Sequence, residues 1–399
     1  MKQAIKKKSF VKPSSDDIRA KLGLTIKPNE EPIKMSELTV SSAEKKTEFI
    51  IMPTAFEEAL RLPGIPMGYL TLVAGWSNTG KSTIKNCLIA ACQRQGILPV
   101  IYETEGNFDW KYAIDCGVKA EPIYGDIIDD ETGEVVNGIV NYTGDFLFYD
   151  SKILADRYGD IDHSQGKKLS TKRKVAVIED IATSINEILD LQDSGDIAQP
   201  ICFIWDSIGS LVSYKSFTSK VNNNMWDASA IAQYFNLIIN NRIPSSRKVS
   251  EPYTNTLFCV NKLFTEMAAS GPVSQPSSGI KGGKTMTYGA RLIIHVGGVL
   301  KASVKTLSAT HKGETYNYGI VSKIKVTKNQ LPTPYHISYA GTIACVHNGL
   351  VSEDKLEEYK KQYAKEILGM IDKQRGEIRN ITDSDVEEME FNESENDSE

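Results

Sequence analysis

The 399-residue chain lacks several features that mark particular classes of protein. No apolar run approaches the roughly 20 residues that a membrane-spanning helix needs, and no secretory signal follows the start. The six cysteines are scattered and form no C-x-x-C pair, so small buried thiols in a reducing compartment are expected. The sequence therefore predicts a cytoplasmic protein with no membrane partner. It also contains no internal repeat.

Basic residues are missing from one end of the chain. Residues 381–399 carry nine acidic side chains and no basic one, whereas the first twelve residues contain five lysines. Ends of opposite charge recur in nucleic-acid-binding proteins, where an acidic tail competes with DNA for the basic surface. The alternative is that both ends are disordered and only keep the protein soluble.

A G-x-x-x-x-G-K-[ST] motif begins at Gly75. This motif indicates a phosphate-binding loop when a strand precedes it and a helix follows it. The apolar run 68–74 predicts the strand, and residues 84–95 predict the helix. The residues expected to contact a nucleotide here are Gly75, Ser77, Asn78, Thr79, Gly80, Lys81, Ser82 and Thr83.

The residue types of this loop suit a polyphosphate. Glycines allow successive backbone N–H groups to turn toward the phosphates, and the helix N-terminus adds a partial positive charge. We expect Lys81 to reach the β- and γ-phosphates and the Ser82 hydroxyl to bind Mg²⁺. ATP and Mg²⁺ are therefore the expected cofactors.

Composition divides the chain into four parts. Residues 1–48 are expected to form a basic N-terminal arm that could take part in polymerisation, and residues 49–348 an ATPase core with an insertion at 119–175. Residues 349–380 predict a helical segment, and residues 381–399 a disordered acidic tail.

Strands and helices alternate through the core, which favours an α/β fold with a mainly parallel central sheet. Short strands over 290–344 predict an antiparallel edge. Within the insertion, residues 126–138 predict a hairpin, while the basic run 167–174 is either a contact to duplex DNA or a solvated loop.

Carboxylates follow two of the predicted strands. The run 201–205 is apolar or aromatic and ends at Asp206, which could bind Mg²⁺ through water or could instead cap the next helix. Glu103 and Glu105 end the strand after the phosphate-loop helix, where a carboxylate can orient an attacking water. Glu105 is the better candidate because it lies further past the strand end, although either side chain could simply be solvated.

The order of these motifs resembles the RecA recombinase family, and its phage branch most of all. The resemblance covers residues 50–345 apart from the insertion, and it implies a RecA-like P-loop NTPase. It is carried by residues 62–68, the phosphate loop, residues 105–112 with Gly117-Val118, Trp205-Asp206-Ser207, Lys281-Gly282-Gly283 with residues 287–291, and residues 326–329 with Pro334.

The resemblance implies roles for individual residues. Glu105 matches the catalytic glutamate, and Asp206 matches the aspartate linked to Mg²⁺. Asp109 and Tyr112 match positions that contact adenine, and their spacing puts them on one helix face. Lys328 matches a lysine that reaches the γ-phosphate of the neighbouring subunit and stabilises charge in trans.

The chain departs from the family pattern at two positions. Asn261 matches the family, but Lys262 replaces the glutamine beside it that senses the γ-phosphate; Lys262 could itself be that sensor. Gln330 stands where bacterial members carry a second lysine.

DNA contacts are expected in two segments. Residues 264–287 are rich in glycine and serine and suit a phosphate backbone that is gripped without sequence readout; the alternative is a plain surface loop. Residues 213–226 match the family's first DNA loop, where Met225 or Trp226 could insert between bases or pack in the core. The residues expected to contact DNA are Lys281, Gly282, Gly283, Lys284, Lys215 and Lys220.

The sequence thus predicts an ATP-dependent homologous recombinase. We expect it to form a helical homo-oligomeric filament on single-stranded DNA and to pair this strand with double-stranded DNA. A single-strand-binding protein and a loading mediator are further possible partners. Two alternatives remain: a ring helicase or translocase on the same core, and an ATP-binding regulatory paralogue that exchanges no strands.

Overall fold

The structure is a computed structural model that describes residues 44–128, 133–221, 224–266, 277–280, 283–298, 303–332, 339–374, 376 and 381–396. The chain divides into two units, residues 1–44 and residues 45–399. Nearly all of the first unit, and with it most of the predicted arm, lies outside the described residues. The second unit contains the phosphate loop.

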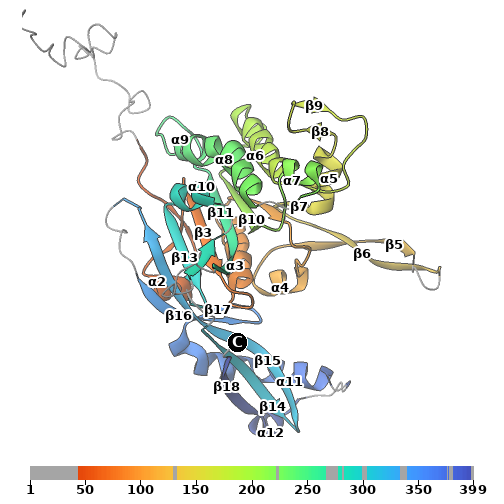
Figure 1. Cartoon of the computed structure of the whole chain (residues 1–399). Helices are drawn as coiled ribbons and strands as arrows, with labels where there is room; N and C mark the ends of the chain where they lie inside the picture. The colour runs from red at the N-terminus through yellow and green to blue at the C-terminus, as the bar shows by residue number, and fades with distance from the viewer. Residues whose placement is uncertain are drawn as a thin grey trace, which may run out of the picture. The chain divides into compact units, whose positions relative to one another are not determined.

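Six parallel strands form the centre of the main sheet, in the order β13-β3-β11-β10-β4-β7 (Figure 1). Every residue of β3, β4 and β10 is buried, as expected for parallel strands covered on both faces. The bounds are β3 Leu70–Gly75, β4 Leu98–Glu103, β7 Leu147–Asp150, β10 Ile201–Ile208, β11 Thr256–Glu266 and β13 Leu292–Val296.

Antiparallel strands extend the sheet beyond β13, in the order β15-β16-β17. The predicted antiparallel edge is therefore present, although β15 is one strand of 16 residues where short strands were expected. These strands are β14 Val304–His311, β15 Glu314–Asn329, β16 Ala340–Val346, β17 Gly349–Val351 and β18 Glu390–Asn396, and β12 Ser277–Ile280 pairs with β11.

Helices cover both faces of the central sheet. Apolar residues of α2, α3 and α4 pack with one face, and those of α5, α6, α8 and α10 pack with the other. Their bounds are α2 Thr54–Leu60, α3 Lys81–Arg94, α4 Trp110–Asp115, α5 Ser151–Tyr158, α6 Ile178–Asp193, α7 Tyr214–Ser219, α8 Asn224–Leu237, η3 Ile238–Arg242, α9 Ile243–Ser245 and α10 Gly283–Gly289. None of the helices in the described ranges is long and apolar enough to cross a membrane.

Three two-stranded sheets lie outside the main sheet. β1 (Phe49–Ile51) pairs with β2 (Gly64–Pro66). In the insertion, β5 (Glu121–Ile128) pairs with β6 (Val135–Thr143), and β8 (Ile161–Asp162) pairs with β9 (Lys167–Lys168). The β5–β6 ribbon extends away from the central sheet (Figure 1).

The C-terminal residues form a third hydrophobic cluster. Helix α11 (Leu356–Gln374), preceded by η4 (Glu353–Lys355), packs on β14 and β15. The sequence predicts a disordered tail from residue 381, but residues 383–387 form helix α12 (Asp383–Glu387), and β18 pairs with β14. Met389 is 7% exposed within this cluster. Apolar Met389 and Phe391, spaced two apart among the acids, give this strand a buried side.

Candidate nucleotide site

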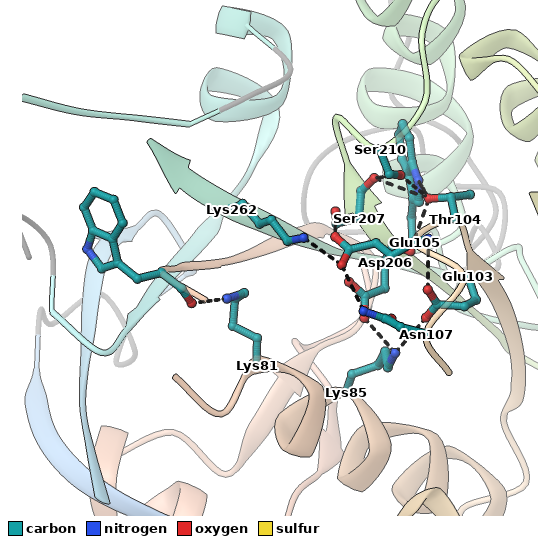
Figure 2. A network of polar contacts seen from close by, with 12 residues as sticks. Lys81, Lys85, Glu103, Thr104, Glu105, Asn107, Asp206, Ser207, Ser210 and Lys262 are labelled. Carbon is teal, nitrogen blue, oxygen red and sulfur yellow. Dashed lines mark hydrogen bonds and ion pairs between the residues drawn. The ribbon is translucent and has the colours of Figure 1, made fainter. Parts of the chain in front are cut away.

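The phosphate loop joins β3 to α3, as the motif predicts. Asn78 and Gly80 have positive φ values of 56° and 97°, which turn the loop backbone before the helix. A Cβ at Gly80 would collide with the Cys345 sulfur. The Lys81 ammonium lies within the loop and donates to the carbonyl of Trp76 (Figure 2).

A cavity of about 480 Å³ opens beside the loop. Residues 78–83 form one wall, and residues 316–320 of β15 with residues 345–347 form another. Tyr112 also lines it, and its hydroxyl contacts Thr83 Oγ1 at 2.6 Å and donates to the Val346 carbonyl at 3.2 Å. The cavity therefore combines a phosphate loop with an aromatic wall, as a nucleotide requires.

Asp109 begins helix α4 and accepts a hydrogen bond at 2.9 Å from the backbone N–H of Tyr112. This cap fixes the start of the helix, and thereby the direction from which Tyr112 enters the cavity wall. Of the two residues assigned to adenine, only Tyr112 is part of that wall.

A buried lysine lies between two strand-end carboxylates. Lys85 Nζ is 3.0 Å from Glu103 Oε2 and 2.6 Å from Asp206 Oδ2, because β4 and β10 place Glu103 and Asp206 side by side. Burial lowers the pKa of Lys85, but the two carboxylates outweigh it and the net pKa is raised. Burial raises the pKa of Glu103. Lys85, Glu103 and Asp206 therefore form one compact buried cluster.

Glu105 lies beside Asp206, on the side away from Lys85 (Figure 2). One of its oxygens is 2.8 Å from Lys262 Nζ, the other accepts from the Ser207 hydroxyl, and its N–H donates to Glu103 Oε1 at 3.0 Å. Burial raises the pKa of Glu105, but the hydrogen bonds from Lys262 and Ser207 prevail and hold it below its usual range. The carboxylate is therefore ionised and fixed in position.

The chemistry of this site fits ATP and Mg²⁺. Burial lowers the pKa of Lys81 to about 8, against the opposing effect of Asp206 and Glu105, so a polyanion in the cavity would stabilise its charged form. Ser82 is exposed at the cavity. Its hydroxyl and the Asp206 carboxylate are oxygen donors of the kind Mg²⁺ prefers.

The residues predicted to sense the phosphate lie on the neighbouring strand. Asn261 and Lys262 of β11 are opposite Ala74 and Gly75 of β3. Asn261 is fully buried, whereas the Lys262 side chain is half exposed. β11 thus brings Lys262 to the phosphate loop, where it pairs with Glu105.

The residues assigned to DNA and to the neighbouring subunit lie elsewhere. Lys281 and Gly282 fall outside the described residues, and Gly283 and Lys284 begin α10. Lys328 donates to the carbonyls of Thr287 and Tyr288, both at 2.9 Å. It thus holds the end of α10, the helix that begins with Gly283 and Lys284.

The first DNA segment contains α7 and the start of α8. Lys215 lies over the Trp226 ring at 4.7 Å, and Lys220 ends α7 in a left-handed conformation. Met225 is 79% exposed, so of the two readings for Met225 core packing is wrong.

Sequence reasoning missed several residues of the site. Lys85 was read only as part of the helix after the loop, although a lysine inside the apolar stretch Ile84–Cys92 signals a buried partner. The hydrogen bond from Ser207 to Glu105 and the cavity wall from Tyr316 to Ile320 have no local sequence signal. The wall comes from strands more than 200 residues from the loop, and no local pattern links them.

The chain is similar to bacterial RecA proteins over part of its length. It is 36% identical to protein RecA of Campylobacter lari over 66 residues, which are 16% of this chain and 19% of that protein. It is 30% identical over 102 residues to protein RecA of Roseiflexus castenholzii, 23% of this chain and 29% of that protein. It is also 30% identical over 102 residues to protein RecA of Aquifex aeolicus, 24% of this chain and 30% of that protein.

No protein-family model matches the chain. It spans less than a third of the length of each of these curated relatives. Together with the α/β fold and its mostly parallel sheet, the partial matches support a RecA-like family for this chain.

Proposed function

We propose that the protein is a DNA-dependent ATPase that acts as a homologous recombinase, of the kind found in the phage branch of the RecA family. It forms a helical filament on single-stranded DNA and pairs that strand with a homologous duplex. The observation that carries the proposal is the cavity beside the phosphate loop, with Asp206 in β10 and Glu105 just after the adjacent strand β4. The partial similarity to RecA proteins supports the same conclusion.

The site residues divide the work of ATP hydrolysis. Lys81 and the loop N–H groups, Gly75 to Thr83, bind the phosphates, and Tyr112 with Asp109 at the start of its helix binds adenine. Ser82 directly, and Asp206 through water, would hold Mg²⁺, which would supply positive charge to the phosphates when bound.

Glu105 performs the proton step. Its carboxylate orients a water and accepts a proton as the water oxygen attacks the γ-phosphorus, and the bond to the β-phosphate oxygen breaks to leave ADP and phosphate. Asn261 and Lys262 are opposite Ala74 and Gly75 of β3. There they respond to the loss of the γ-phosphate, and β11 carries the resulting movement toward the second DNA segment.

A neighbouring copy completes the site. In the proposed filament, Lys328 leaves the carbonyls at the end of α10 and reaches the neighbour's γ-phosphate. Its release frees α10, which overlaps the end of the second DNA segment. Lys281, Gly282, Gly283 and Lys284 there, with Lys215 and Lys220, contact the phosphate backbone. A single-strand-binding protein and a loading mediator would assist assembly in the host cytoplasm.

Electron microscopy tests the proposed assembly. With single-stranded DNA and a non-hydrolysable ATP analogue, the protein should form helical filaments, and Lys81→Ala should not. Lys111→Ala is the matched control, because Lys111 is an exposed lysine paired with Asp115 on α4. Closed rings would instead establish the helicase alternative. Filaments that yield no joint molecules in a strand-invasion assay would establish the regulatory paralogue.

A further inference from the structure

The β5–β6 ribbon exposes apolar side chains on both of its faces. Exposed apolar groups on this scale normally mark an interaction surface. The ribbon extends into solvent away from the sheet (Figure 1). The eight side chains, each 38–68% exposed, are Ile123, Tyr124, Ile127, Ile128, Val135, Val136, Ile139 and Val140.

Cross-strand register sorts these side chains into two faces. Tyr124 is opposite Ile139 and Ile128 is opposite Val135, and these four form one face. On the other face, Gly125 is opposite Gly138, and the side chains of Ile127 and Val140 lie against these glycines. A two-stranded ribbon with two apolar faces is marginal by itself, so a covering partner would stabilise it.

The root of the ribbon is fixed on the nucleotide-binding core. Trp110, the first residue of α4, stacks on Tyr142 at 4.6 Å and also contacts Phe146 and Phe148. Strands of eight or nine residues then carry the ribbon roughly 25 Å outward, at about 3.3 Å per residue. The ribbon is therefore an anchored arm, long enough to reach another molecule.

The arm and a nearby part of the insertion carry opposite charge. Residues 121–145 contain seven acidic side chains and no basic one, and residues 163–175 contain five basic side chains and no acidic one. We call residues 163–175 the basic loop. Its Lys167 and Lys174 are exposed, and Val175 beside them is 47% exposed.

We propose that the β5–β6 arm of one copy docks on the basic loop of a second copy of this chain. Acidic residues such as Asp126 and Glu134 face Lys167 and Lys174 of the second copy, and apolar residues of the arm cover Val175. The two surfaces differ, so the contact is head-to-tail and leaves a pair of copies with one free arm and one free basic loop. This contact goes beyond the proposed function, because it requires neither nucleotide nor DNA.

Sedimentation velocity of the full chain, without nucleotide or DNA, tests the contact. The wild type should associate as its concentration rises, and less so at high salt because the charges are exposed. Asp126→Lys/Glu134→Lys in the arm, or Lys167→Glu/Lys174→Glu in the loop, should each lower the association constant about tenfold. Tyr124→Ser/Ile139→Thr should also lower it, whereas Leu191→Ser, which removes an exposed apolar side chain from α6, should not.

Combining the charge-reversed variants distinguishes the loss of this contact from damage to the fold. A chain with both charge reversals should regain association, and so should an equimolar mixture of the two singly reversed chains. A monomeric wild type, or reversed chains that stay monomeric when combined, would overturn the inference. Retained ATP binding in Lys81→Ala, together with wild-type association, would leave the arm contact intact and count only against the proposed nucleotide site.

Discussion

Lys262 Nζ lies 2.8 Å from Glu105 Oε2. Ser207 donates to the other oxygen of Glu105, so both oxygens of the proposed general base are engaged. A carboxylate held this way is a weak base until its cation moves. We infer that the γ-phosphate draws Lys262 away from Glu105, which couples the presence of ATP to the activity of the base.

The first prediction concerns the pH profile of Lys262→Met. Removing the cation should raise the pKa of Glu105, because Lys262 opposes the effect of burial. A base must be ionised, so activity falls as pH drops through its pKa, and this fall should begin at higher pH in the variant. The measurement is kcat/KM for ATP from about pH 5 to 8. If the acid limbs of the Lys262→Met and wild-type pH profiles coincide, Lys262 does not control the pKa of the base.

The second prediction concerns stability. Lys85→Met leaves Glu103 and Asp206 buried together without their cation, and should lower the free energy of unfolding by about 3–5 kcal/mol. Lys85→Met/Glu103→Gln removes one of the charges and should recover part of the loss. Urea denaturation measures both. The control is Lys111→Met, which breaks the exposed pair with Asp115 and should lower the free energy of unfolding by about 0.5 kcal/mol or less. A loss in Lys85→Met no larger than that in Lys111→Met would refute the buried cluster.

The third prediction concerns the pH dependence of nucleotide binding. The pKa of Lys81 is about 8 before an anion binds, and bound phosphates raise it, so binding takes up a proton above that pH. Affinity for ATP should be constant from about pH 7 to 8 and then fall about tenfold per unit. Fluorescence titration measures it. Lys81→Arg remains charged, so its weaker affinity should not change over this range; the same decline in both proteins would point to another group.

The fourth prediction separates charge from structure in the C-terminal residues. Removing residues 381–399 takes away β18 and buried Met389, and should cost at least about 2 kcal/mol of unfolding free energy. Glu387→Gln/Glu390→Gln keeps the strand and removes two exposed charges. If the acidic residues compete with DNA, this variant should bind duplex DNA about twofold more tightly at low salt. Unchanged affinity would leave them a structural role.

Local sequence patterns predicted the parts of the site whose residues are close together in the sequence. The motif from Gly75 to Ser82 joins the end of a strand to the start of a helix. The apolar run ending at Asp206 is a strand by length and composition. Both depend on short-range physics, namely backbone conformation and side-chain burial. The parallel centre of the sheet followed from the alternation of such elements.

Long-range pairing decided the parts that the sequence did not predict. Lys85 acquires its role only when β4 and β10 bring Glu103 and Asp206 together. The wall from Tyr316 to Ile320 depends on the position of β15 in the sheet. The acidic composition of residues 390–396 suggested disorder, but pairing with β14 and burial of Met389 outweighed it. Tertiary context overrides local preference in each case.

A subunit-mixing experiment tests the central claim, that Lys81 of one copy and Lys328 of its neighbour complete one ATP site. Lys81→Ala and Lys328→Ala should each be nearly inactive in ATP hydrolysis on single-stranded DNA. In an equimolar mixture, about a quarter of the interfaces receive both lysines, so roughly that share of wild-type activity should return. A mixture no more active than the separate variants would contradict a site shared between copies.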